Sequence, residues 1–170
     1  MPQRGSRSFM KQGRQNRFPR KPKRLHTVFG ILDQPLYFVT FNSSERKKIL
    51  ANHDVHKAFR SYAEKNGEQG RAIGGYVIMP DHVHFFARLV PGQNLSTFVR
   101  LLKQSLTKAL RLRDCPAPFW QGGFFDHVLR SSESYADKWA YVRSNPVRDG
   151  LVDKTEDWPY QGEVIDIDRA

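Results

Sequence analysis

Residues 72–90 (AIGGYVIMPDHVHFFARLV) decide the fold, because they contain two apolar runs joined by a turn signal. The runs Ala72–Met79 and His82–Val90 are rich in β-branched and aromatic residues, which is typical of strands. Pro80 and the aspartate after it are turn-forming residues, so the stretch predicts an antiparallel hairpin. Gly74 and the glycine that follows it either weaken the first strand or mark a bulge.

Segments on either side of this hairpin have the character of strands and helices. One further strand is expected on each side, at Leu36–Phe41 and Phe124–Leu129. Apolar and capping patterns predict helices over residues 45–50, 55–66, 95–113 and 133–145, the last of them ended by Pro146. The order of strands and helices predicts an α+β fold: an antiparallel sheet sandwiched by helices, close to the ferredoxin-like arrangement.

Charge divides the 170 residues into a tail and a body. Nine of the 28 basic residues lie within residues 1–25, which contain no acidic residue, so the tail carries most of the net charge of +11. We expect residues 1–24 to be a disordered basic tail, residues 25–160 to form one domain and residues 161–170 to form a C-terminal tail. The tail side chains expected to contact nucleic-acid phosphates are Arg14, Arg17, Arg20, Lys21, Lys23 and Arg24. A solubilising tail or a membrane-surface contact is the alternative.

Several classes of protein are disfavoured by the composition. No apolar run approaches the roughly 18 residues of a membrane span, and the basic N-terminus is not followed by the apolar segment of a secretory signal. The one cysteine, Cys115, excludes an internal disulfide. These features favour a protein of a reducing cytoplasm and disfavour a membrane protein.

His82 and His84 lie two residues apart on a predicted strand. Side chains at this spacing point to the same face of a sheet, so the two imidazoles could bind one metal ion. The spacing is also compatible with a polar sheet face that binds no metal.

Tyr141 and Asn145 lie four residues apart at the end of the last predicted helix and share one helix face. An amide oxygen combined with two imidazoles gives mixed N/O ligation, which suits Mg²⁺ or Mn²⁺. The alternative is a half-buried tyrosine and an asparagine that caps the helix before Pro146.

Four motifs together resemble a known family. They are MPDHVH at 79–84, FWQ at 119–121, FDHVLR at 125–130 and YVRSNPVRDGLV at 141–152. In combination they resemble the single-tyrosine transposases with a His-hydrophobic-His (HUH) motif, of the IS200-like type, and most closely their REP-associated branch. The resemblance extends from about Leu36 to Trp158.

This resemblance implies the HUH endonuclease version of the ferredoxin-like fold and an assignment of roles. His82, His84 and Asn145 would bind the divalent metal, Mg²⁺ or Mn²⁺, and Tyr141 would attack DNA. The implied reaction is endonuclease cleavage and strand transfer on single-stranded DNA near hairpin or REP-like palindromic ends, through a 5′-phosphotyrosine intermediate. The family includes both monomers and homodimers, and the resemblance implies a bacterial protein of the cytoplasm, associated with the nucleoid.

Other side chains are weaker candidates for DNA contact. Basic residues of the long predicted helix could follow a DNA backbone, although a solvated helix face is the equal alternative. An aromatic residue after the helix could stack on an unpaired base or pack under a loop. These candidates are Arg100, Lys103, Lys108, Arg111, Trp120 and Arg130.

Two other functions remain open from the residues alone. One is a non-catalytic protein that binds DNA or RNA hairpins, although residues 122–128 (GGFFDHV) do not match the RNA-recognition signature. The other is a metal-dependent hydrolase that uses an activated water in place of Tyr141.

Overall fold

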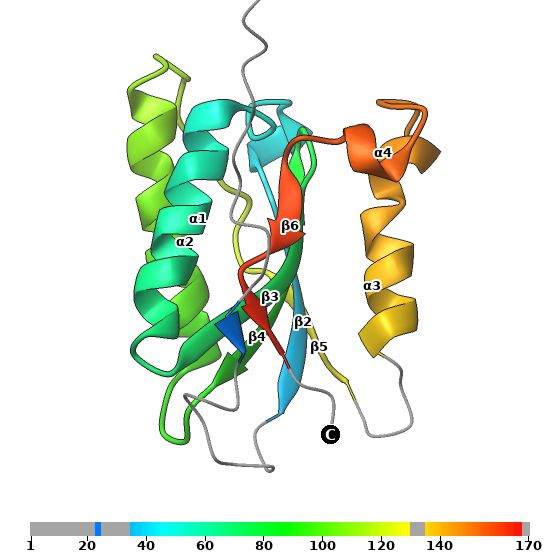
Figure 1. Ribbon diagram of the computed structural model, residues 1–170. Helices are drawn as coiled ribbons and strands as arrows, with labels where there is room; N and C mark the ends of the chain where they lie inside the picture. The colour runs from blue at the N-terminus through cyan, green and yellow to red at the C-terminus, as the bar shows by residue number, and fades with distance from the viewer. Residues whose placement is uncertain (1–22, 25–34, 130–134, 168–170) are drawn as a thin grey trace, which may run out of the picture.

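One antiparallel sheet organises the described part of the chain. The computed structural model describes residues 35–129 and 135–167, together with the backbone of residues 23–24. Among these residues the main sheet has five strands in the order β5-β2-β4-β3-β6, with the expected hairpin, β3–β4, near its centre (Figure 1). The strands are β2 (Leu36–Asn42), β3 (Arg71–Ile78), β4 (His82–Leu89), β5 (Phe125–Leu129) and β6 (Gln161–Glu163).

Helices cover both faces of this sheet. Figure 1 shows α1 (His53–Gly67) and α2 (Leu95–Arg111) side by side on one face, and α3 (Tyr135–Arg143) on the other. The short helix α4 (Asn145–Arg148) follows α3 directly. The α+β fold with an antiparallel sheet between helices is therefore confirmed.

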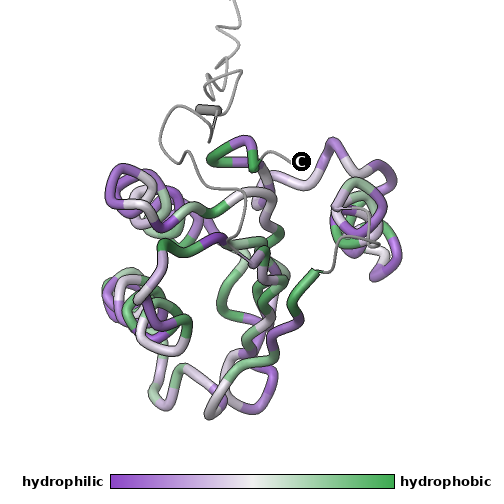
Figure 2. The backbone as a smooth tube through the Cα atoms, turned by 90° about the horizontal axis from the view of Figure 1, so that it is seen from below, coloured by the Kyte–Doolittle hydropathy of each residue, from purple (hydrophilic) through white to green (hydrophobic). Residues whose placement is uncertain are grey.

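The larger core lies between the sheet and the α1–α2 pair. Asn52 and Asn94 start the two helices, because each side chain accepts a hydrogen bond from a backbone N–H in the first turn. Beneath the helices Phe59 packs on Tyr76, with ring centroids 4.6 Å apart, and meets the edge of Phe85 at 6.0 Å. Figure 2 shows the hydrophobic segments along the strands and the hydrophilic ones mostly on the outer sides of the helices.

The glycine pair in β3 allows α3 to approach the sheet closely. The register shifts between Ile73 and Tyr76, so of the two alternatives the glycine pair marks a bulge. The Gly75 N–H donates to the Tyr135 hydroxyl at 2.9 Å, and a Cβ on Gly75 would lie 2.8 Å from the Trp139 ring. Phe86 packs on Tyr135 with centroids 4.7 Å apart. α3 is thus fixed to the face opposite α1 and α2.

The helix expected over residues 45–50 is wrong. A single 3₁₀ turn forms instead, and Glu45 and Arg46 have φ of +53° and +55°, which no continuous α-helix contains. The Ser43 hydroxyl donates to the Lys47 carbonyl at 2.7 Å, offering the backbone a local partner that competes with helical hydrogen bonds.

The last predicted helix also ends earlier than expected. α3 stops at Arg143 and α4 begins at Asn145, with Pro146 in its first turn. Proline restricts the residue before it and lacks an N–H, so it is tolerated at the start of a new helix and not within a continuing one. The expected start at residue 133 lies outside the described residues.

The boundary expected at residue 160 is wrong as well. β6 pairs with β3, and β7 (Ile165–Asp166) pairs in parallel with β1 (Lys23–Arg24). Val164, Ile165 and Ile167 are buried. The segment expected to be a tail therefore belongs to the folded unit through residue 167. Its strands are two and three residues long, too short for a visible alternation in the sequence.

Candidate active site

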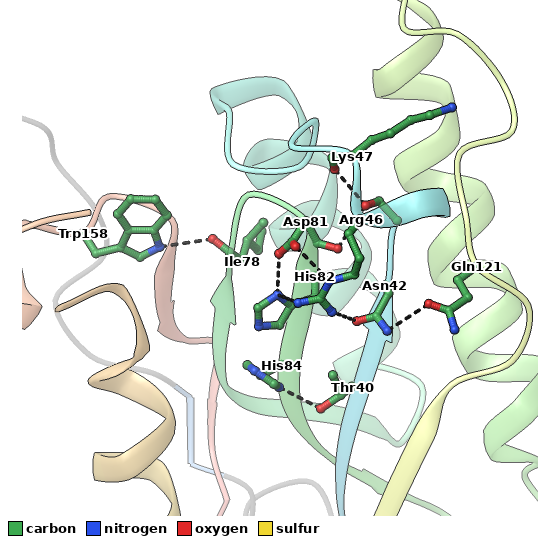
Figure 3. A network of polar contacts seen from close by, with 11 residues as sticks. Thr40, Asn42, Arg46, Lys47, Ile78, Asp81, His82, His84, Gln121 and Trp158 are labelled. Atoms are coloured by element: carbon green, nitrogen blue, oxygen red, sulfur yellow. Dashed lines mark hydrogen bonds and ion pairs between the residues drawn. The ribbon is translucent and has the colours of Figure 1, made fainter. Parts of the chain in front are cut away.

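The register of β2 and β4 places both candidate metal ligands on one face of the sheet. Thr40 lies opposite His84, and Asn42 lies opposite His82. Directly paired residues of antiparallel strands share a face, so these four side chains project together. The two imidazole centroids are 4.6 Å apart, and Figure 3 shows both rings on the side of the sheet where α3 lies. The expected side-by-side arrangement is present.

Each imidazole uses the same ring nitrogen for a protein contact. His82 Nδ1 lies 2.6 Å from Asp81 Oδ1, and His84 Nδ1 lies 2.7 Å from Thr40 Oγ1. When both Nδ1–H groups donate to these oxygens, each Nε2 keeps a lone pair for a ligand. Histidines that bind metals are commonly oriented in this way, with the second ring nitrogen bonded to a carboxylate or another oxygen.

Burial and charge set the protonation states around the pair. Burial, followed by electrostatic interaction with His82, Arg46, Arg148 and Lys138, lowers the pKa of His84 to about 3. His84 is therefore a neutral imidazole at physiological pH, the form that can ligate a metal. Burial alone would raise the pKa of Asp81, but its contacts with His82 and Arg46 outweigh burial and lower it.

Asn145, the third candidate ligand, has a side-chain oxygen in an unusual environment. Its residue is buried, and its Oδ1 has no hydrogen-bond partner among the described residues. A buried acceptor without a partner costs about 1–3 kcal/mol, so this atom is suited to a ligand. No group of three His, Cys, Asp or Glu side chains that could hold a metal is found in the described ranges. Two imidazoles and one amide oxygen fit a divalent cation.

Tyr141 lies on the helix that covers the histidines in the same chain. Its side chain is 59% exposed, and the Arg148 guanidinium lies 4.2 Å from its ring centroid. The same Arg148 is among the charges that lower the pKa of His84. One turn earlier on α3, Lys138 lies over Phe38, whose ring stacks on His84 with centroids 5.5 Å apart. The Tyr141 ring thus contacts Arg148, and its helix reaches the pair through Lys138 and Phe38.

A polar network at the end of the sheet was missed by the sequence reasoning. The Arg46 guanidinium lies 2.8 Å from Asp81 Oδ2 through Nε and donates to Asn42 Oδ1 at 2.7 Å through Nη1 (Figure 3). Asn42 in turn donates to Gln121 Oε1 at 3.2 Å. No local pattern identifies Arg46, because its partners come from other elements. Asp81 could have been noticed as the neighbour of His82.

The basic candidates of α2 do not join this site. Arg100, Lys108 and Arg111 are exposed on a helix that covers the opposite face of the sheet (Figure 1). Lys103 has a structural role: its ammonium donates to the Gly123 carbonyl at 2.6 Å and to that of Gln121 at 3.2 Å, and burial lowers its pKa.

Of the remaining candidates for DNA contact, Trp120 is packed in the fold and the others lie outside the fully described residues. Trp120 packs under the loop, since its Nε1 donates to Thr107 Oγ1 at 2.8 Å and its ring meets Phe41 edge-on at 5.3 Å. This favours packing over base stacking. Candidates outside the described residues are Arg14, Arg17, Arg20, Lys21 and Arg130, and only the backbone is described for Lys23 and Arg24.

The chain belongs to the family of IS200-like transposases, whose pattern matches residues 34–145. The resemblance inferred from the MPDHVH and YVRSNPVRDGLV motifs is thereby confirmed. Within the described residues, the helices are all too short or too polar to cross a membrane.

Its relatives include REP-associated enzymes. The REP-associated tyrosine transposase of Escherichia coli (strain K12) is 26% identical over 135 residues, which cover 79% of each chain. A solved structure of a REP-associated tyrosine transposase bound to a REP hairpin is 26% identical, with a TM-score of 0.62 over 75% of each chain.

Proposed function

We propose that this transposase is a metal-dependent endonuclease and strand transferase for single-stranded DNA, with Tyr141 as its nucleophile. The observation that carries the proposal is the grouping of two imidazoles, each with Nδ1 engaged, beneath a helix that presents an exposed tyrosine. The solved relative bound to a REP hairpin supports hairpin or REP-like palindromic DNA as the substrate. Such a reaction would take place on chromosomal DNA, in the cytoplasm at the nucleoid.

His82 and His84, through Nε2, and Asn145, through Oδ1, would hold the divalent cation, Mg²⁺ or Mn²⁺. A cation bound there would neutralise the scissile phosphate and orient it for in-line attack. The protein contribution is preorganisation: Asp81 and Thr40 fix the rings, and the depressed pKa keeps His84 free of a competing proton.

Tyr141 would carry out the covalent step. A bond forms between its phenolic oxygen and phosphorus while the bond from phosphorus to the 3′ oxygen breaks. The phenol loses its proton, and the departing oxygen gains one and becomes a free 3′-OH. The product is a 5′-phosphotyrosine, which retains the energy of the phosphodiester for rejoining without a nucleoside triphosphate. Arg148, 4.2 Å from the ring centroid, stabilises the negative charge that develops on the phenol.

Two further features concern how DNA is held. The docking of α3 on the sheet that carries the histidines supports a site completed by one chain, as a monomer or as each half of a homodimer. Arg100, Lys108 and Arg111 lie across the sheet from Tyr141, so we assign them to contacts with the DNA backbone away from the cleaved phosphate.

The test is formation of a covalent adduct. Purified protein, Mn²⁺ and a labelled oligonucleotide carrying a hairpin should give a band that survives denaturing electrophoresis, and Tyr141→Phe should abolish it. Tyr62→Phe is the matched control, because Tyr62 lies on α1, across the sheet, and donates to the Phe98 carbonyl. The adduct should form normally in this variant.

Other results would identify a different function. Cleavage that persists in Tyr141→Phe but disappears in His84→Ala would indicate a hydrolase with an activated water. Hairpin binding that survives EDTA, without cleavage in the unmodified protein, would indicate a non-catalytic binding protein.

A further inference from the structure

Two consecutive residues of the loop after β2 adopt a backbone conformation that side-chain-bearing residues rarely take. Glu45 has φ of +53° and Arg46 has φ of +55°. Non-glycine residues at positive φ persist only where surrounding contacts determine them, and they concentrate at functional sites. The contacts here are Ser43 N–H to the Asp81 carbonyl at 2.9 Å and Leu50 N–H to the Pro80 carbonyl at 2.9 Å. The loop is thus tied to the turn that precedes His82.

This backbone conformation places the Arg46 guanidinium beside Asp81, Asn42 and His82. Arg46 Nε lies 2.8 Å from Asp81 Oδ2, Nη1 donates to Asn42 Oδ1 at 2.7 Å, and Nη2 lies 3.4 Å from His82 Nδ1 (Figure 3). Two nitrogens of one planar group therefore engage Asp81 and Asn42. Nη2 lies beside His82 Nδ1 but makes no hydrogen bond with it when Nδ1–H donates to Asp81. Lysine, a point charge on a flexible stem, cannot reproduce such a fork.

The carboxylate between Arg46 and His82 connects them. One Asp81 oxygen contacts Arg46 at 2.8 Å, and the other contacts His82 Nδ1 at 2.6 Å. A carboxylate held from one side presents its second oxygen in a constant direction. That direction determines which imidazole nitrogen carries the proton and where Nε2 points.

We infer that Arg46 is a positioning residue for His82, acting through Asp81 and Asn42. It maintains the Nδ1–H tautomer and ring orientation that leave Nε2 of His82 free to ligate a metal. The inference rests on the proposed function for the identity of the ligand, but the orientation of His82 is a property of the metal-free protein. A surface ion pair of this exposure contributes little stability by itself, so stability does not account for the strained loop.

The first measurement concerns the metal-free protein. The full-length chain is labelled with ¹⁵N-histidine, and two-bond ¹H–¹⁵N spectra are recorded at pH 8, with His82 assigned by comparison with His82→Ala. The unmodified protein should show a single Nδ1–H tautomer at His82. Arg46→Ala should show a mixture of the two tautomers.

The second measurement is the affinity for Mn²⁺, from the free ion detected by electron paramagnetic resonance. Arg46→Ala should weaken binding about tenfold or more, as loss of an outer-shell partner commonly does. Arg46→Lys should also weaken it, because the charge remains but the fork is lost. The matched control is Arg113→Ala, which removes a similarly exposed arginine paired with Asp54 at 3.0 Å on other elements; it should leave the affinity unchanged.

The inference is overturned if Arg46→Ala keeps the single tautomer, or if its Mn²⁺ affinity stays within twofold of the unmodified protein. It is also overturned if the unmodified, metal-free protein already shows a tautomer mixture. Absence of Mn²⁺ binding to the unmodified protein would contradict the proposed metal site instead, and the spectra would still decide the role of Arg46. Melting curves verify that each variant is folded.

Discussion

Among single residues, Asn145 is notable for a buried side-chain oxygen that could accept a ligand. Its buried Oδ1 lacks a hydrogen-bond partner in the described structure, so the side chain adds little to the stability of the metal-free protein. A ligand that used this oxygen would turn an unfavourable group into a favourable one. A structural asparagine behaves in the opposite way, since its hydrogen bond stabilises the protein under all conditions.

Asn145→Ala is therefore expected to melt at or above the temperature of the unmodified protein without metal, and to lose much of the stabilisation that Mn²⁺ provides. Asn94→Ala is the control, because Asn94 caps α2 by accepting from the Thr97 N–H at 2.9 Å. It should cost about 1 kcal/mol with or without Mn²⁺. Thermal melts of both variants at several Mn²⁺ concentrations provide the measurement. An equal loss of stability in Asn145→Ala under both conditions would count against ligation.

At the scale of elements, the bulge in β3 and the helix α3 act as one unit. Tyr135 and Trp139 contact Gly75 from α3, the first through its hydroxyl and the second through its ring. Tyr141, the proposed nucleophile, is on the same helix, two residues beyond Trp139. Because a helix moves as a rigid body, a change at the bulge should displace the tyrosine relative to the histidines.

Gly75→Ala tests this coupling, since the new Cβ would lie 2.8 Å from the Trp139 ring. We expect a loss of about 1–3 kcal/mol in the free energy of unfolding from overpacking. We also expect slower adduct formation under conditions where the variant is fully folded. Gly122→Ala has no atom within 4 Å of the added carbon and should change neither quantity. Urea denaturation and single-turnover adduct assays measure the two effects. Normal adduct kinetics in Gly75→Ala would show that α3 adjusts independently of β3.

On the scale of the whole molecule, many of the basic residues lie in a different part of the chain from the candidate active site. The net charge is +11, yet seven of the basic residues lie in residues 1–22, and the remaining sequence is only mildly basic. The proposed contacts of Arg14, Arg17, Arg20 and Lys21 with phosphate would add affinity without sequence preference. Cleavage would depend on the folded unit alone.

Removal of residues 1–22 should therefore weaken DNA binding and make it less sensitive to salt. Each phosphate contact with a single strand contributes about 0.7 to the slope of log K against log salt, so the slope should become less steep by up to about 5. Adduct formation at saturating DNA should be unchanged. Binding titrations from low to moderate salt, for the full and shortened chains, provide the comparison. An unchanged slope would show that residues 1–22 make no contact with the DNA phosphates.

The sequence by itself determined the elements whose signals are local. Alternation and a turn signal identified the β3–β4 hairpin, three- and four-residue spacing identified α1 and α2, and the motif around His82 identified the family. Only the tertiary structure decided the left-handed turn at Arg46 and the strands beyond residue 160. These depend on partners distant in sequence, such as Asp81 for Arg46. No local pattern of side chains encodes which distant surfaces will meet, because that is settled by packing of the whole chain.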